Sequence, residues 1–160
     1  MLTSTSIGEL LFVAKNALTD DRAWFDAMSD KAFQDWIVDL IREDQLIDKS
    51  VDGDGNAIGY MAKDGFRTTY SPATEAITNG RKRAGDPFNL YDTGAFHKSI
   101  FITVMRDSFI VDGNGNKGDD DLFVKFGDEI IGITDENMDR VSAILAEKYR
   151  EYLIKVLLDN

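Results

Sequence analysis

The segment LYDTGAFHKSI, around the one histidine of the chain, gathers most of the side chains that could do chemistry. His97 could act as a general base for Ser99 or Ser71, with Asp92 or Asp107 orienting the imidazole. A small hydrolase or protease is therefore one alternative function. It is not favoured, because the sequence has no Gly-x-Ser-x-Gly turn and no glycine-rich segment beside a candidate serine. We therefore expect no enzyme activity.

The same segment contains the triplet Asp92-Thr93-Gly94, which also occurs at the active site of aspartic proteases, where two carboxylates share a proton. Those sites have hydrophobic residues before the aspartate and a second copy of the triplet, whereas Tyr91 and a polar stretch precede it here. We interpret the triplet geometrically instead. We expect Asp92 or Thr93 to cap a short helical turn and Gly94 to allow a close backbone approach or a positive φ.

The residues after the triplet are expected to turn the chain into a strand. Phe96 and Ile100 are four residues apart and can both face the core, while His97 and Lys98 face solvent. Ser99 and Ile100 lead directly into a stretch rich in β-branched and aromatic side chains. We therefore predict a structural pivot rather than a catalytic site.

Two glycine-rich turns suggest calcium but lack most of its ligands. The stretches DGDGN (52–56) and DGNGN (112–116) resemble the start of an EF-hand loop. That loop needs Gly at its sixth position and Glu at its twelfth, where the first stretch has Ala and Lys and the second has Lys and Phe. We expect no metal and no cofactor. Weak cation binding at Asp52 and Asp54, or at Asp119–Asp121, stays open.

Composition argues against several classes of protein. The chain has 160 residues, 43% of them hydrophobic, a net charge of −11 and no cysteine. The size suits one domain, and the lack of cysteine excludes disulfides and thiolate metal sites. The negative charge argues against nucleic-acid binding. The apolar runs are shorter than the ~20 residues that span a bilayer, so we expect no membrane partner. No Lys or Arg precedes the first apolar segment, so a secretory signal is not supported.

Positive charge is concentrated in one part of this acidic sequence. Residues 61–84 contain five Lys and Arg residues, among them Arg81, Lys82 and Arg83, against two acidic residues. This basic region is either a solvated loop whose charge is offset by acidic neighbours or a patch that meets an acidic partner surface.

Hydrophobic spacing predicts an α+β fold in a single domain, residues 1–160. Helices are expected over residues 6–18, 20–28 and 29–46. Residues 48–90 show no sustained period and contain both prolines of the chain, so we expect a long, loop-rich arm. Long irregular segments in compact domains are usually functional or ordered by a partner, and this arm is therefore expected to be an extended assembly arm.

A β-hairpin and a long C-terminal helix complete the expected fold. Strands are predicted at residues 100–104 and 109–111, with a turn at 106–108. The Gly and Asn residues of 112–116 are expected to leave the second strand with positive φ. A helix capped by Thr134 should run almost to the end of the chain. Its buried stripe is expected to consist of Met138, Val141, Leu145, Tyr149, Tyr152 and Val156.

The order of several short motifs resembles a known family. These motifs are Ser71-Pro72-Ala73-Thr74, Gly80-Arg81-Lys82-Arg83, Asp92–Ile100 leading into a hairpin, and KFGD at 125–128 followed by Ile130–Asn137 before the last helix. In this order they are similar to small head-tail joining or tail-completion proteins of tailed bacteriophages. The stretch SVDGDGNAIG is similar to its counterpart in phages of Bacteroides-like hosts. Residues 60–69 look like an insertion in that pattern.

The resemblance implies a non-enzymatic virion protein of the neck or tail region, made in the cytoplasm of the bacterial host. Such a subunit would form or join a cyclic ring of identical copies and contact portal or connector and tail proteins, since heterologous contacts that close make a ring. The alternative is another minor capsid or tail assembly protein without ring symmetry. The residues expected to serve structure and assembly are Ser71, Pro72, Arg81, Lys82, Arg83, Asp92, Thr93, Gly94, Phe96, Ser99 and Ile100.

Overall fold

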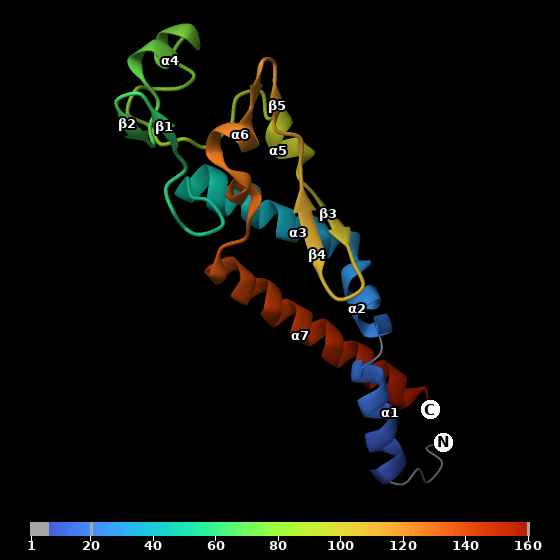
Figure 1. Ribbon diagram of the computed structural model, residues 1–160. Coiled ribbons are helices and arrows are strands. Elements are labelled where there is room, and N and C mark those ends of the chain that lie inside the picture. Colours follow the sequence, from blue (N-terminus) through green and yellow to red (C-terminus); the bar gives the residue numbers. More distant parts are fainter. Residues whose placement is uncertain (1–6, 20, 160) are drawn as a thin grey trace.

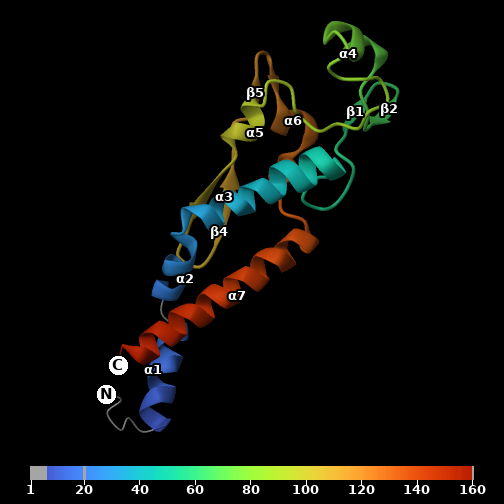
Figure 2. The same cartoon turned by 180° about the vertical axis from the view of Figure 1, so that it is seen from behind.

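The computed structural model describes residues 7–19 and 21–159, so the helix starts expected at Ser6 and Asp20 lie outside the described residues. Figures 1 and 2 show an elongated molecule with α1 and the last turns of α7 at one end and part of the arm at the other. Helices and two-stranded antiparallel sheets make up its regular structure, which confirms the expected α+β class. Among the described helices, none combines the length and the apolar character needed to cross a membrane.

Four helical segments follow one another at the start of the fold: α1 (Ile7–Thr19), α2 (Asp21–Met28), α3 (Lys31–Asp39) and the π-helical η1 (Leu40–Lys49). Asp30 caps α3, because its side chain accepts hydrogen bonds from two backbone N–H groups of the first turn. The third predicted helix is therefore present, but it continues past Leu46. It stops at Ser50, which has a left-handed backbone (φ 55°).

After η1 ends at Lys49, the rest of the arm (residues 48–90) holds three short regular elements in an otherwise irregular path. They are β1 (Tyr60–Ala62), β2 (Gly65–Arg67) and α4 (Pro72–Ile77), and each is too short to show a hydrophobic period in the sequence. In both views these elements project at one end of the molecule (Figures 1 and 2). The arm also contributes four buried side chains to the core: Ile58, Tyr70, Phe88 and Leu90.

The predicted hairpin consists of β3 (Phe101–Val104) and β4 (Phe109–Asp112), which pair antiparallel. It follows α5 (Ala95–Ser99), the short helical turn expected after the Asp-Thr-Gly triplet. The predicted turn is confirmed, because the backbone N–H of Met105 donates to the carbonyl oxygen of Ser108 at 2.8 Å.

The chain leaves β4 through four short elements: β5 (Asn116–Lys117), β6 (Asp120–Asp121), α6 (Leu122–Phe126) and the 3-10 turn η2 (Asp128–Ile131). The expectation of positive φ in residues 112–116 is wrong, since Gly113 and Gly115 do not have it. Gly115 is required by packing instead, because a Cβ there would lie 2.6 Å from the Phe123 ring.

The long C-terminal helix is α7 (Asp135–Leu158). The Thr134 side chain accepts a hydrogen bond from the backbone N–H of Asn137, as the capping pattern predicts. Gln45, fully buried on η1, fixes this end of the helix. Its Nε2 donates to the Gly132 carbonyl at 2.8 Å, and its Oε1 accepts from the Thr134 backbone N–H and the Asn137 side chain, both at 3.0 Å.

Two clusters of buried apolar side chains form the core. One lies beneath the arm and α6 and includes Ile58 and Ile130. The other lies between α3 and the first half of α7 and includes Ile37 and Val141. Ile102 of the β3–β4 hairpin packs against both clusters, so the hairpin connects them.

Candidate assembly surface

The apolar stripe of α7 is only partly covered. Of the six residues predicted to be buried, Val141 is 1% exposed and Met138 is 39% exposed, while the other four are half-buried: Leu145, Tyr149, Tyr152 and Val156. The prediction of a fully buried stripe is therefore wrong, although its helical period is correct. The physical reason is that α7 packs mainly on α1 and α2 and leaves a groove between its first half and β4.

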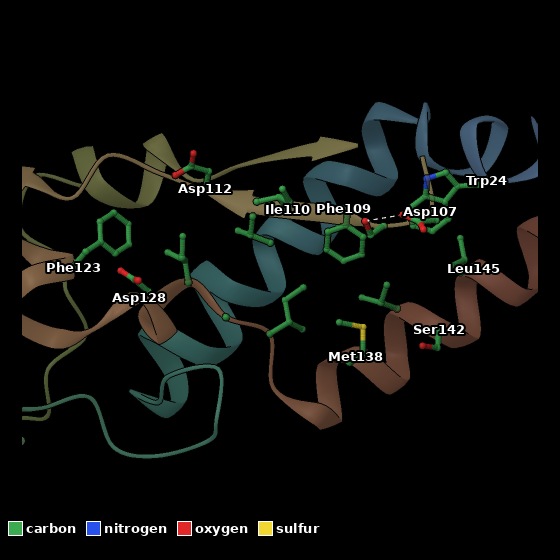
Figure 3. Close-up of a pocket in the computed structure, with 16 residues that line it drawn as sticks. Trp24, Asp107, Phe109, Ile110, Asp112, Phe123, Asp128, Met138, Ser142 and Leu145 are labelled. Atoms are coloured by element: carbon green, nitrogen blue, oxygen red, sulfur yellow. Dashed lines mark hydrogen bonds between the residues drawn. The ribbon is translucent and has the colours of Figure 1, made fainter. Parts of the chain in front are cut away.

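This groove has a volume of about 720 Å³ and is lined mainly by apolar side chains. Figure 3 shows Phe109 and Ile110 of β4 on one side, Met138 and Leu145 of α7 on the other, and Trp24 of α2 at one end. Ile110 is 52% exposed and lies at the rim of the groove, because Phe109 and Val111 on either side of it face the core. Exposed apolar surface of this kind marks an interaction site for another protein or a ligand-binding groove.

Acidic side chains accompany the apolar floor of the groove. Asp107, Asp112 and Asp128 are exposed and belong to its lining, whereas none of its lining residues is Lys, Arg or His. The hydroxyl of Ser108 donates to the Asp107 carboxylate at 3.2 Å, without an imidazole in the lining to take part (Figure 3). The groove therefore favours a segment that carries apolar side chains flanked by positive charge.

A second uncovered apolar surface lies on the arm tip, which we define as residues 60–83. Met61 and Phe66 are cross-strand partners in the β1–β2 hairpin and are 75% and 62% exposed. Directly opposite residues share one face of a sheet, and the other face carries Tyr60, which packs against rings of the core. Ile77 of α4 is also exposed, and Lys63 lies in the hairpin turn. The arm tip thus presents apolar side chains beside a cation.

A third uncovered apolar surface lies on α1, at the opposite end of the molecule (Figure 1). Ile7, Leu11 and Phe12 are all exposed there. This surface carries one lysine, Lys15, and one acidic residue, Glu9, so its charge does not complement the acidic groove as the arm tip does.

The structure joins two of the sequence motifs at Asp92. The Asp92 carboxylate lies 3.0 Å from Nζ of Lys117 and 3.6 Å from Nη1 of Arg81, and the hydrogen bond from Lys117 lowers the pKa of Asp92. Of the two residues expected to cap the turn, Asp92 does not do so, because its carboxylate pairs with Lys117 and Arg81 instead. Thr93 makes the hydrogen bond closest to a cap, because its hydroxyl accepts from the backbone N–H of Ala95, the first residue of α5, at 3.3 Å. The Asp-Thr-Gly turn in this way holds the basic cluster against the body of the protein.

The remaining pivot residues shape the turn. Gly94 has a positive φ of 78°, and a Cβ there would lie 3.1 Å from the Tyr91 hydroxyl, which confirms the expectation. Phe96 and Ile100 are buried, as predicted. The Ser99 hydroxyl donates to the Phe96 carbonyl at 2.7 Å and accepts from a backbone N–H in the loop after β4 at 2.8 Å. Ser99 therefore fastens α5 to the end of the hairpin.

His97 is buried, so the expectation that it faces solvent is wrong. The rings of Tyr91 and Phe96 pack edge-on against the imidazole, which turns it inward. Nε2 lies 2.9 Å from the carbonyl oxygen of Asn89 and carries the proton, because a carbonyl oxygen only accepts. Burial lowers the pKa of His97. The side-chain hydrogen bonds of the described residues do not join this ring to a serine or an aspartate, so the triad candidates are not brought together.

The Ser-Pro-x-Thr motif is a helix start. Ser71 caps α4 by accepting a hydrogen bond from the backbone N–H of Thr74 at 3.2 Å, and Pro72 occupies the first turn. Farther along, the Glu75 carboxylate accepts from the backbone N–H of Ala84 at 2.8 Å. The basic cluster is therefore held in a closed loop on α4.

The three basic residues of that loop have different surroundings. Arg81 faces Asp92 as described, and Nζ of Lys82 lies 5.0 Å from the centre of the Tyr70 ring. Burial lowers the pKa of Lys82. Arg83 is exposed, and the ion pairs found within residues 21–159 do not include it. The two interpretations of the basic region thus apply to different residues. The charge of Arg81 is balanced by Asp92 of the same chain, while Arg83 is available to a partner.

The acidic turns are explained by local hydrogen bonds. Oδ1 of Asp52 accepts from the backbone N–H groups of Asp54 at 3.1 Å and Asn56 at 2.8 Å, which is the geometry of an Asx turn. Asp121 caps α6 by accepting from the backbone N–H of Phe123 at 2.8 Å. Within the part of the chain that the structure describes, no group of three or more His, Asp or Glu side chains is arranged to hold a metal ion.

Sequence reasoning missed both the groove and the β1–β2 hairpin. An available signal for the hairpin was Asp64-Gly65, a dipeptide typical of tight turns, between the apolar residues Met61 and Phe66. The groove has no comparable signal, because it depends on how far α7 lies from β4.

Neither a protein-family model nor a curated protein nor a solved structure matches this chain.

Proposed function

We propose that this chain is a structural protein of a tailed bacteriophage virion and that it forms a ring of identical subunits in the neck or tail-completion layer. The motif order from Ser71 to Asn137 supports the phage assignment through the resemblance described above. On this proposal the chain is made in the host cytoplasm, joins the portal or connector to the tail proteins, and carries out no enzymatic step.

The observation that carries the proposal is the presence of two complementary uncovered surfaces on one chain. The groove is apolar with acidic side chains, and the arm tip is apolar with Lys63 and Arg83 exposed. The elements that carry them, β4 and α7 for the groove and β1, β2 and α4 for the arm tip, lie in different parts of the molecule (Figures 1 and 2). A contact between unlike surfaces repeats from copy to copy, and it gives a ring when the rotation closes.

Immunogold labelling of phage particles tests the location. An antibody against this chain should label the junction between head and tail of intact particles, and deletion of its gene should give separate heads and tails. Labelling spread over the capsid would favour the alternative of a minor capsid protein without ring symmetry. Normal joined particles after deletion of the gene would contradict a neck role.

A further inference from the structure

We propose that the β1–β2 hairpin of one copy docks in the groove of the next copy. In this arrangement Met61 and Phe66 cover the apolar floor between β4 and α7, and Lys63 lies beside the acidic side chains of the groove. The inference rests on the proposed self-assembly and names the two surfaces that make the contact.

The hairpin presents a suitable apolar face. Met61 and Phe66 point to the same side of the two-stranded sheet, away from the core. Both side chains are more than half exposed in the part of the chain that the structure describes. The Phe66 ring lies over the backbone of Gly59, where a Cβ would come within 2.6 Å of it. This support holds the ring in an extended position without covering its outer face. Aromatic and methionine side chains are enriched at the centres of protein interfaces.

The groove offers the matching concave surface. Its walls come from separate elements, with Phe109 and Ile110 on β4 and Met138 and Leu145 on α7 (Figure 3). At about 720 Å³ it is large enough to receive more than one side chain. Val141 already closes the floor. An inserted pair of apolar side chains would therefore cover the part of the α7 stripe that the chain itself leaves open.

Charge selects the arm tip over α1 as the occupant. Arg67 is neutralised by Asp64 at 2.6 Å, but Lys63 has no ion pair among residues 21–159. Asp107 lies at one end of the groove and Asp112 and Asp128 lie at the other, so one of these two acidic ends would provide its partner (Figure 3). Because each copy has a net charge of −11, copies repel one another, and a local attraction of this kind is needed to set the contact.

One such contact is weak, and closure makes it stable. An aromatic side chain buries only about 150–250 Å², whereas a stable interface buries about 1,200–2,000 Å² in total. An isolated pair of copies would therefore dissociate readily. In a closed ring each copy uses both its hairpin and its groove, so loss of one contact leaves the copy held by the other.

Disulfide trapping tests the contact directly, since the natural chain has no cysteine. Full-length Met61→Cys protein is mixed with full-length Ser142→Cys protein and oxidised. Ser142 lines the groove on α7, and cysteine is close to serine in size. A linked product that contains one copy of each variant is necessarily intermolecular. The proposal predicts its rapid formation, because a disulfide needs Cα atoms within about 7 Å.

The matched control replaces Val124, which is 86% exposed on α6 and outside the arm, and mixes Val124→Cys with Ser142→Cys. Equal trapping in the control and the test pair would overturn the proposal. Preferential trapping of Ser142→Cys by Leu11→Cys would also overturn it, because the groove would then hold α1 of the neighbour.

A second variant separates this inference from the proposed function. Phe66→Glu should raise the concentration needed for assembly by about tenfold or more, while Val124→Glu should leave it unchanged. Sedimentation of the cysteine-free parent gives its oligomeric state independently. If rings form but Met61→Cys does not trap Ser142→Cys, the docking inference fails and the ring proposal stands. If the parent stays monomeric at every concentration, the ring proposal itself fails.

Discussion

Replacing Gln45 by leucine should loosen the attachment of α7 to the helical body. The buried amide makes three hydrogen bonds at the start of α7, to the Gly132 carbonyl, the Thr134 backbone N–H and the Asn137 side chain. Leucine would leave the two backbone groups unpaired, whereas the Asn137 amide would keep its 2.8 Å bond to Asp44. The two backbone groups are only partly buried, so we take the lower half of the usual cost, about 1–2 kcal/mol each.

The buried leucine offsets about 1 kcal/mol of this cost through its apolar surface. The expected net loss is therefore about 2 kcal/mol in the free energy of unfolding. Urea denaturation followed by far-UV circular dichroism measures it, at one fixed protein concentration because association also adds to stability. The matched control is Gln34→Leu, which removes one partly exposed hydrogen bond to the Met28 carbonyl and should cost less than about 1 kcal/mol.

A double-mutant cycle strengthens the test. Asn137→Leu alone should also destabilise the protein, because the Asn137 amide donates to Asp44 and to Gln45. The double variant Gln45→Leu with Asn137→Leu should lose less stability than the sum of the two single losses, since the shared bond can be removed only once. A Gln45→Leu protein as stable as the parent, or strict additivity in the cycle, would refute the role assigned to this network.

Three other predictions concern the pivot. Gly94→Val should lower the free energy of unfolding by about 1–3 kcal/mol, because the backbone φ at Gly94 is 78°. The control is Gly113→Ala, which should melt like the parent because Gly113 does not have a positive φ. Equal melting temperatures of the two variants would contradict the role of Gly94. Burial lowers the pKa of His97 below the unfolded value of 6.5, so the unfolded chain binds the extra proton and stability should fall as the pH drops below 6.5. His97→Phe should flatten the stability profile between about pH 7 and pH 5, and an unchanged profile would exclude His97 as its cause. Asp92→Asn removes the ion-pair partner of Arg81 and Lys117, so trypsin should cut faster at Arg81–Arg83, as followed by mass spectrometry. The control variant Asp119→Asn should leave the cleavage rate unchanged. Equal cleavage rates in the two variants would contradict the role of Asp92 in holding this loop.

Long and strongly patterned elements could be predicted from the sequence. The apolar spacing of α3, the cap at Thr134 and the β-branched strands of the β3–β4 hairpin are local signals, and the structure confirms each of them. The left-handed backbone at Gly94 also follows from local chemistry, because glycine in an Asp-Thr-Gly turn adopts positive φ without a Cβ penalty.

Features that depend on distant parts of the chain could not be predicted in this way. His97 is buried because Tyr91 and Phe96 pack around it, although its spacing from Phe96 predicted an outward position. Asp92 meets Lys117, which is far along the chain, so its role as an ion-pair partner has no local signal. The exposure of Met138 has the same origin, because a helical period identifies the apolar stripe but not the element that covers it.

Native mass spectrometry of the purified full-length chain, over rising protein concentration, shows directly whether the copies close into a ring. Ring closure predicts a change from monomer to one closed oligomer with a single copy number and few intermediates, because only closure uses the hairpin and the groove of every copy. A chain that stays monomeric at all concentrations, or one that gives a continuous ladder of sizes without a preferred copy number, would contradict it.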